Sequence, residues 1–155
     1  MPATIRPATP ADVPALVGLM QAFYAEAGFP LPAEPATTAF ATLLGTPALG
    51  AVWLAERDGA PTGHAVLTVA FSMEFGGLRG FIDDLFVQPG ERGQGTGAAL
   101  LAAVRAGAVT RGLRALCVET GGPDHPARGL YARAGYTDSG HALLVLPLAG
   151  PVHTS

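Results

Sequence analysis

A glycine-rich turn between a strand and a helix is the feature of this sequence that most constrains its fold. Residues 80–87 predict a strand that stops at Pro89. The run Gly93-Gln-Gly-Thr-Gly97 follows, and apolar residues at helical spacing then predict a helix over residues 96–110. A strand that turns through glycines into a long helix is a unit of α/β folds, so the sequence predicts that class.

Such a turn is suited to holding an anion. Unpaired N–H groups at the start of a helix converge on one point, and the helix dipole favours negative charge there. Arg92 adds a positive charge and a donor fork that fits phosphate oxygens. The glycines alone are equally consistent with a connector that only turns the chain. Arg92 and the flanking strand and helix favour the phosphate site.

Two common phosphate-binding motifs, the P-loop and the dinucleotide fingerprint, match this segment only in part. In a P-loop, Lys followed by Ser or Thr would stand at Thr96-Gly97, and their absence disfavours a nucleoside triphosphatase. Gly93, Gly95 and Ala98 match a relaxed dinucleotide fingerprint, with Glu119 at a plausible distance. That match lies in mid-chain, after several predicted antiparallel strands, which disfavours NAD or FAD.

The remaining pattern predicts a mixed, mostly antiparallel central sheet flanked by helices, in one domain over residues 1–155. Thr9-Pro-Ala-Asp12 predicts a capped helix start, and Asp58-Gly59 predicts the turn of a β-hairpin. The expected helices cover residues 10–27, 35–44, 96–110 and 126–134, and the expected strands cover residues 5–6, 52–56, 62–71, 80–87, 113–118 and 141–146.

Charge and composition narrow the partners and the location. The net charge is −3 and the arginines are scattered, so nucleic acid is not expected as a partner. No apolar run reaches the roughly 18–20 residues of a membrane span, and the start lacks a secretion signal. The lone Cys117 cannot form an internal disulfide, which fits the cytoplasm. No histidine pair has metal-ligand spacing, so no metal site is expected.

Two segments of the chain carry family-specific motifs. Arg92-Gly-Gln-Gly-Thr-Gly97 matches the pattern Arg/Gln-x-x-Gly-x-Gly/Ala, and the stretch from Ala127 to Tyr136 matches A-x-x-L-Y-x-x-x-G-F/Y. In both motifs, and in the strand Asp84–Pro89 before the first, the chain resembles the GNAT superfamily of acyl-CoA-dependent N-acyltransferases. The resemblance covers about residues 3–147. It implies the fold described above and an acetyl-CoA-dependent N-acetyltransferase that releases CoA.

The resemblance also implies which residues bind acetyl-CoA. Backbone groups of the strand would bind the pantetheine and the acetyl carbonyl, and amides of the glycine-rich loop would bind the pyrophosphate. Asp124 stands where the family often has Asn, and an ionised carboxylate accepts hydrogen bonds but cannot donate them. The implied cofactor-binding residues are Leu85, Phe86, Val87, Arg92, Gly93, Gln94, Gly95, Thr96, Gly97, Ala98 and Asp124.

Acetyl transfer to an amine requires a proton acceptor, because an alkylamine with a pKa of about 10.4 is a cation at neutral pH. Asp83 and Asp84 are the candidates. In a regular strand only one of two neighbours faces a given cleft. A resemblance to polyamine acetyltransferases assigns Asp83 as the base and Asp84 as the charge that binds the amine. Alternatively, one carboxylate caps a strand or pairs with an arginine such as Arg79.

Tyr131 is the candidate general acid. A phenol can give a proton to the thiolate of CoA within a preassembled site. On sequence alone Tyr131 is more readily read as a core aromatic residue, and the family resemblance favours the catalytic role.

The acceptor site is expected to include Tyr24, Glu74 and Asp84. These residues predict an N-acetyltransferase that acts on the primary amine of a small cationic molecule. Two alternatives remain open: a peptide or protein N-acetyltransferase, and a non-catalytic acyl-CoA-binding module. Strands at sheet edges often pair between subunits in such folds, so a homodimer is also an expectation.

Overall fold

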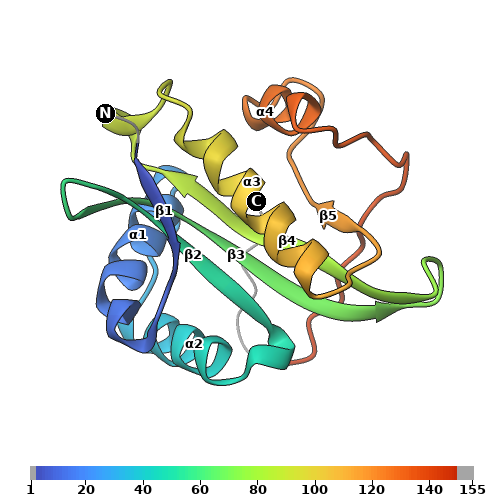
Figure 1. The fold of residues 1–155 in the computed structure, drawn as a ribbon, viewed down its shortest axis with the longest axis horizontal. Helices are drawn as coiled ribbons and strands as arrows, with labels where there is room; N and C mark the ends of the chain where they lie inside the picture. The colour runs from blue at the N-terminus through green and yellow to red at the C-terminus, as the bar shows by residue number, and fades with distance from the viewer. Residues whose placement is uncertain (1–2, 150–155) are drawn as a thin grey trace.

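A computed structural model describes residues 3–149 (Figure 1). Three short 3₁₀ turns, Pro10–Asp12, Pro47–Leu49 and Pro89–Glu91, connect the main elements. In chain order these elements are β1 (Thr4–Pro7), α1 (Val13–Glu26), α2 (Ala33–Gly45), β2 (Gly50–Arg57), β3 (Ala60–Ser72), β4 (Gly77–Val87), α3 (Thr96–Thr110), β5 (Leu116–Val118) and α4 (Ala127–Arg133).

The strands form one sheet in the order β1-β2-β3-β4-β5. Strands β1 to β4 are antiparallel to one another, and β5 is parallel to β4 and is joined to it through α3. Helices α1 and α2 pack on one face and α3 on the other (Figure 1). The predicted mixed, mostly antiparallel sheet flanked by helices is therefore confirmed.

Side chains that alternate along the strands divide the core into two layers. The layer under α1 and α2 is built around Leu16, Phe40, Leu54 and Val66. The layer under α3 contains Trp53, Ala65, Leu67, Ile82, Leu100 and Val104. The carboxylates predicted for the site belong to β4, on the side of the sheet covered by α1 and α2.

The predicted Asp-Gly hairpin is confirmed. Asp58 and Gly59 both have positive φ, 52° and 77°, and they join β2 to β3. Two-residue turns of this kind match the twist of the strands that they connect, and Gly at the second position adopts a positive φ without steric cost.

The predicted final strand over residues 141–146 is wrong. This segment is irregular, and the large apolar side chains that follow His141 are exposed by 58–91%. An apolar run has the composition of a strand, but a strand forms only where an edge accepts its hydrogen bonds. The predicted strand 113–118 is also shorter, and only Leu116–Val118 pairs with β4.

None of the helices described is long and apolar enough to cross a membrane. Residues 3–149 also contain no cluster of three or more His, Cys, Asp or Glu side chains that could hold a metal ion.

Candidate active site

A β-bulge in β4 determines where the two adjacent acids point. Val66 of β3 pairs with Asp84, but the next residue, Leu67, pairs with Ile82, so Asp83 is an extra residue on β4. A bulge interrupts the alternation of side chains. Both carboxylates therefore line the same pocket, on the face covered by α1 and α2. The expectation that only one of them could face a cleft is wrong, because it assumed a regular strand.

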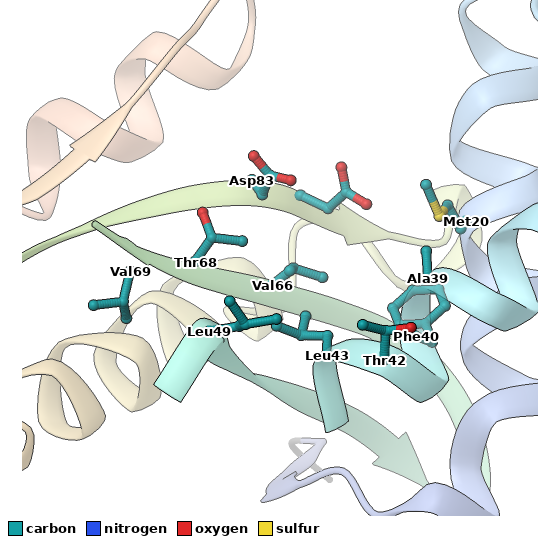
Figure 2. A pocket seen from close by; sticks show the side chains of 11 residues that line it. Met20, Ala39, Phe40, Thr42, Leu43, Leu49, Val66, Thr68, Val69 and Asp83 are labelled. Atoms are coloured by element: carbon teal, nitrogen blue, oxygen red, sulfur yellow. The ribbon is translucent and has the colours of Figure 1, made fainter. Parts of the chain in front are cut away.

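The pocket that contains the two acids has a volume of about 450 Å³ (Figure 2). Helices α1 and α2 contribute Met20, Phe40 and Leu43 to its wall, and the strands contribute Thr68 and the acid pair. The side chain of Asp83 stands on β4 beside that of Thr68 on β3 (Figure 2). All the other lining residues are uncharged, so the pocket has a negative site in a largely apolar wall.

The two carboxylates differ in their surroundings. Burial raises the pKa of Asp83, and the charges of Asp84 and Glu119 add to that shift. Burial and then the charges of Asp84 and Asp83 raise the pKa of Tyr24, which places the Tyr24 hydroxyl in the field of the acid pair. The alternative partner Arg79 instead lies over the ring of Phe81, 4.8 Å from its centroid.

The edge of β4 beyond Ile82 is unpaired on the side of β5. The last residue pair between these strands is Ile82 with Val118, and β4 continues to Val87. The backbone of Leu85 faces that edge and is thus available to a ligand, whereas the Phe86 carbonyl points toward Gly63 of β3 and the Val87 carbonyl accepts a hydrogen bond from Arg92. The bulge at Asp83 lies where the two strands separate.

The glycine-rich loop presents unused amides at the start of α3. Gly93 and Gly95 have φ values of 76° and 83°, which glycine adopts without steric cost. Among the hydrogen bonds of residues 3–149, none is donated by a backbone N–H between Gly93 and Ala98. Thr96 Oγ1 is buried and also has no partner among these residues. A pyrophosphate group fits such a cradle of donors.

Arg92 makes contacts that the sequence did not reveal. Its guanidinium group donates to both oxygens of the Glu26 carboxylate at 2.8 Å and to the carbonyl oxygen of Val87 at 2.8 Å. It also lies 5.7 Å from the centroid of the Phe86 ring. Arg92 therefore ties the end of α1 to the end of β4, and its positive charge is paired with the Glu26 carboxylate.

Arg57 is a second residue that sequence reasoning missed. It donates to Glu91 at 2.7 Å and to the Oε1 atom of Gln94 at 2.8 Å. These contacts fix the loop from the β2–β3 hairpin. No local motif identifies Arg57, because it is distant in sequence from both partners.

Tyr131 lies on α4 and packs in the layer under α3. Its ring is 5.6 Å from that of Tyr136, and burial, with a smaller effect of Tyr136, raises its pKa to about 12. Asp124 is exposed in the loop before α4. Glu74 lies in the exposed β3–β4 turn and is not part of the pocket wall. The structure thus brings Asp83 and Asp84 together with the Tyr24 region, but not with Glu74.

Comparisons with known proteins identify the family of the chain. Residues 16–136 match the model of the acetyltransferase (GNAT) family. The chain is 34% identical over 140 residues to an aminoglycoside N(6')-acetyltransferase type 1 of Stenotrophomonas maltophilia, covering 88% of this chain and 87% of that protein. These findings define the protein as an acetyltransferase.

More particularly, the chain belongs to the GNAT family, whose model matches most of its length. Among solved structures, an integron cassette protein from the mobile metagenome of Cole Harbour Salt Marsh is 51% identical, with a TM-score of 0.88, and the match covers 95% of this chain and 91% of that one. A predicted acetyltransferase of Clostridium acetobutylicum, solved with acetyl-CoA, shares the fold at 20% identity, with a TM-score of 0.79 and coverage of 93% and 96%.

Proposed function

We propose that this chain, as one domain over residues 1–155, transfers the acetyl group of acetyl-CoA to the primary amine of a small cationic acceptor. The observation that carries the proposal is the β-bulge, which turns two adjacent carboxylates into one pocket where β4 separates from β5. An acidic pocket attracts an ammonium group and can accept its proton. The similarity to an aminoglycoside acetyltransferase supports a small molecule with amino groups as acceptor.

In this proposal the cofactor lies along the open edge of β4. Amides from Gly93 to Ala98 bind its pyrophosphate, with the charge of Arg92 beside them, and backbone groups of Leu85 to Val87 bind the pantetheine and the acetyl carbonyl. Asp124 is exposed in the loop before α4, and its carboxylate would accept a further hydrogen bond from the cofactor. Bound acetyl-CoA supplies the thioester whose acetyl group is transferred.

The residues divide the proton transfers between them. Asp84 binds the ammonium group and Asp83 accepts one proton from it, which leaves a neutral nucleophile. The nitrogen–carbon bond forms and the carbon–sulfur bond breaks, and the second proton of the nitrogen passes through water, which returns a proton to the Tyr131 oxygen. The raised pKa of Asp83 makes it a stronger base than an ordinary carboxylate. Strand amides near Leu85 stabilise the charge that develops on the carbonyl oxygen. The Tyr131 hydroxyl gives a proton to the departing sulfur, and Tyr24 contributes a polar group toward the acceptor.

The experiment that tests this function is a panel of amines with acetyl-CoA, in which release of the free thiol is measured. The panel contains aminoglycosides, polyamines, amino acids and peptides. We expect turnover with small cationic amines and loss of turnover in Asp83→Asn. Asp58→Asn, at an exposed acid in the β2–β3 turn, is the matched control. Turnover of peptides alone would establish the protein-modifying alternative, and CoA binding without any turnover would establish the non-catalytic one.

We further propose a homodimer, in which the segment 141–148 of one chain pairs with the outer edge of β5 in a second copy. This segment carries no Asp, Glu or Arg, and its five large apolar side chains are exposed. Isolated proteins rarely expose such a continuous apolar surface. The segment 141–148 of one copy is therefore suited to cover the outer edge of β5 in a second copy of this chain.

Cys117 lies within β5 and gives a direct test of the homodimer. In Leu144→Cys, oxidation should produce a covalent dimer on a non-reducing gel, because a disulfide forms only between close Cα atoms. The same variant with Cys117→Ser is the control. An internal disulfide in a monomer would contradict the proposal. The predicted cytoplasmic location agrees with the free thiol.

A further inference from the structure

His64 is a titratable residue that the mechanism above does not use. It lies on β3 opposite Phe86 of β4 and opposite Leu54 of β2, on the face covered by α1 and α2. Its side chain is completely buried, with 0% exposure. The rings of Phe40 and Phe86 flank it, with centroids 6.1 Å and 6.3 Å away.

Both ring nitrogens of His64 lack a hydrogen-bond partner among residues 3–149. A buried polar group without a partner destabilises the folded chain, so such a group in a well-packed site requires an explanation. The nearest acidic group is the carboxylate of Asp84, whose Oδ2 atom lies 3.8 Å from His64 Nε2. The carboxylate belongs to the pocket, and the imidazole lies behind it.

The geometry of this pair is close to that of a hydrogen bond. An N–H donor reaches an oxygen acceptor at about 2.7–3.2 Å, so a movement of about 1 Å by the Asp84 side chain completes the contact. Asp84 is 11% exposed and lies at the pocket surface, where such a rotation is possible, whereas His64 is fixed between two aromatic rings. The moving partner is therefore the carboxylate, and the fixed partner is the imidazole.

We propose that His64 is a positioning residue for the acceptor amine: its Nε2–H donates to Asp84 and holds that carboxylate toward the ammonium group. This inference rests on the proposed function, in which Asp84 binds the amine. The imidazole stands beside the Asp84 carboxylate, whereas no hydrogen-bond donor within residues 3–149 contacts the Asp83 carboxylate, and this difference separates the roles of the two adjacent acids. Asp84 is held as the binding charge, and Asp83 remains the proton acceptor.

Two substitutions at His64 separate a hydrogen bond from packing. His64→Gln keeps an N–H donor near the position of Nε2, whereas His64→Leu fills a similar volume without a donor. We expect the KM for the amine to rise about tenfold in His64→Leu, as for loss of one hydrogen bond to a charged group, and to stay within about threefold in His64→Gln. The KM for acetyl-CoA should not change in either variant.

A double-mutant cycle with Asp84→Asn decides whether His64 acts through Asp84. If it does, His64→Leu should have no further effect on the amine KM once Asp84 is Asn. Additive effects of the two substitutions would overturn the inference, and so would an unchanged amine KM in His64→Leu. Equal losses in His64→Leu and His64→Gln, in the KM for both substrates, would also overturn it by showing a general packing defect.

A spectroscopic measurement does not depend on turnover and needs no substitution at the buried His64. Long-range ¹H–¹⁵N NMR spectra of the ring should show a protonated Nε2 in His64. This resonance should move in Asp84→Asn and much less in Asp83→Asn. A bare Nε2, or no response to Asp84→Asn, would overturn the inference even if the amine panel succeeds. Failure of the panel with the expected NMR result would instead reject the proposed function.

Discussion

Between Gly80 and Ile82, β4 is paired on both sides, with β3 and with β5, whereas from Asp84 to Val87 it is paired with β3 alone. Along the doubly paired stretch the backbone hydrogen bonds are used within the sheet, and side chains fill the core. Along the singly paired stretch an edge is open and two carboxylates face a pocket. The same strand thus serves stability at one end and ligand binding at the other, and the bulge at Asp83 marks the boundary. Substitutions in the two stretches should therefore have separable effects.

The largest effect is expected where the open stretch of β4 leads into the glycine-rich loop. Gly95→Arg introduces a side chain at a residue with φ of 83° and fills the space between the loop amides. The affinity for CoA in calorimetry should fall at least about a thousandfold, since several charge-assisted hydrogen bonds of about 1.5–3 kcal/mol each are lost. Gly90→Arg adds the same charge at a glycine with no positive φ and serves as control. Normal CoA binding by Gly95→Arg would remove the loop from the cofactor site.

At the boundary itself, Asp83→Asn should lower kcat by at least about a hundredfold, as expected for loss of a general base. Asp84→Asn should act mainly through the KM of the amine, because this carboxylate is assigned to binding. Steady-state kinetics over a range of pH distinguish the two. If Asp84→Asn has the larger effect on kcat, the roles of the two acids are reversed.

A smaller effect is expected at Tyr131, on the opposite layer of the molecule. Tyr131→Phe should lower kcat about tenfold and leave CoA affinity unchanged, because a phenol with a pKa of about 12 is a weak proton donor that water can partly replace. Single-turnover kinetics and calorimetry on the same variant measure both quantities. An unchanged kcat would assign Tyr131 to packing alone.

In the doubly paired stretch of β4, Gly80→Ala should affect stability and not catalysis. A Cβ at this position would lie 2.5 Å from a methyl group of Leu67 and 2.9 Å from one of Leu116. Overpacking of this kind lowers the free energy of unfolding by about 1–3 kcal/mol. Urea unfolding measures the loss, and kcat per folded molecule should stay within about twofold. A large fall in kcat without a loss of stability would contradict the division of β4.

The smallest effect is a gain in stability at the active site. The pKa of Asp83 is raised in the folded chain, so its stabilising contribution is complete below the ordinary aspartate pKa of about 3.9 and is lost as the pH rises through the raised value. Asp83→Asn avoids this loss. Because Asp83 is an exposed residue, water screens much of this effect. The melting temperature of Asp83→Asn at pH 7 should exceed that of the wild type by at most about 1 °C, and the difference should vanish near pH 3. A lower melting temperature at pH 7 would show that Asp83 makes a stabilising contact.

The sequence predicted the elements that depend on local signals. The Asp58-Gly59 turn, the strand before the glycines and the long helix after them all follow from turn chemistry and periodicity, and each is confirmed. The acid pair could also be identified from its position before the glycine-rich loop.

The features that could not be predicted depend on pairing between distant segments. The bulge at Asp83 exists only in the register of β4 against β3, so the sequence of β4 alone does not reveal it. The same holds for His64, whose relation to Asp84 crosses from one strand to the next. In the sequence, His64 is recognisable only as a polar residue in the middle of an apolar strand, at the same alternating position as Val66.

The extra residue in β4 also affects how this chain can change during evolution. A single substitution at Asp83 or Asp84 changes the functional groups in the pocket, and can thereby change which acceptor the chain binds. Deletion of one residue between Ile82 and Leu85 would instead restore a regular pleat and leave one acid at most on that face. Variation in length at this point is therefore far more damaging than variation in composition, although the strand itself would survive both.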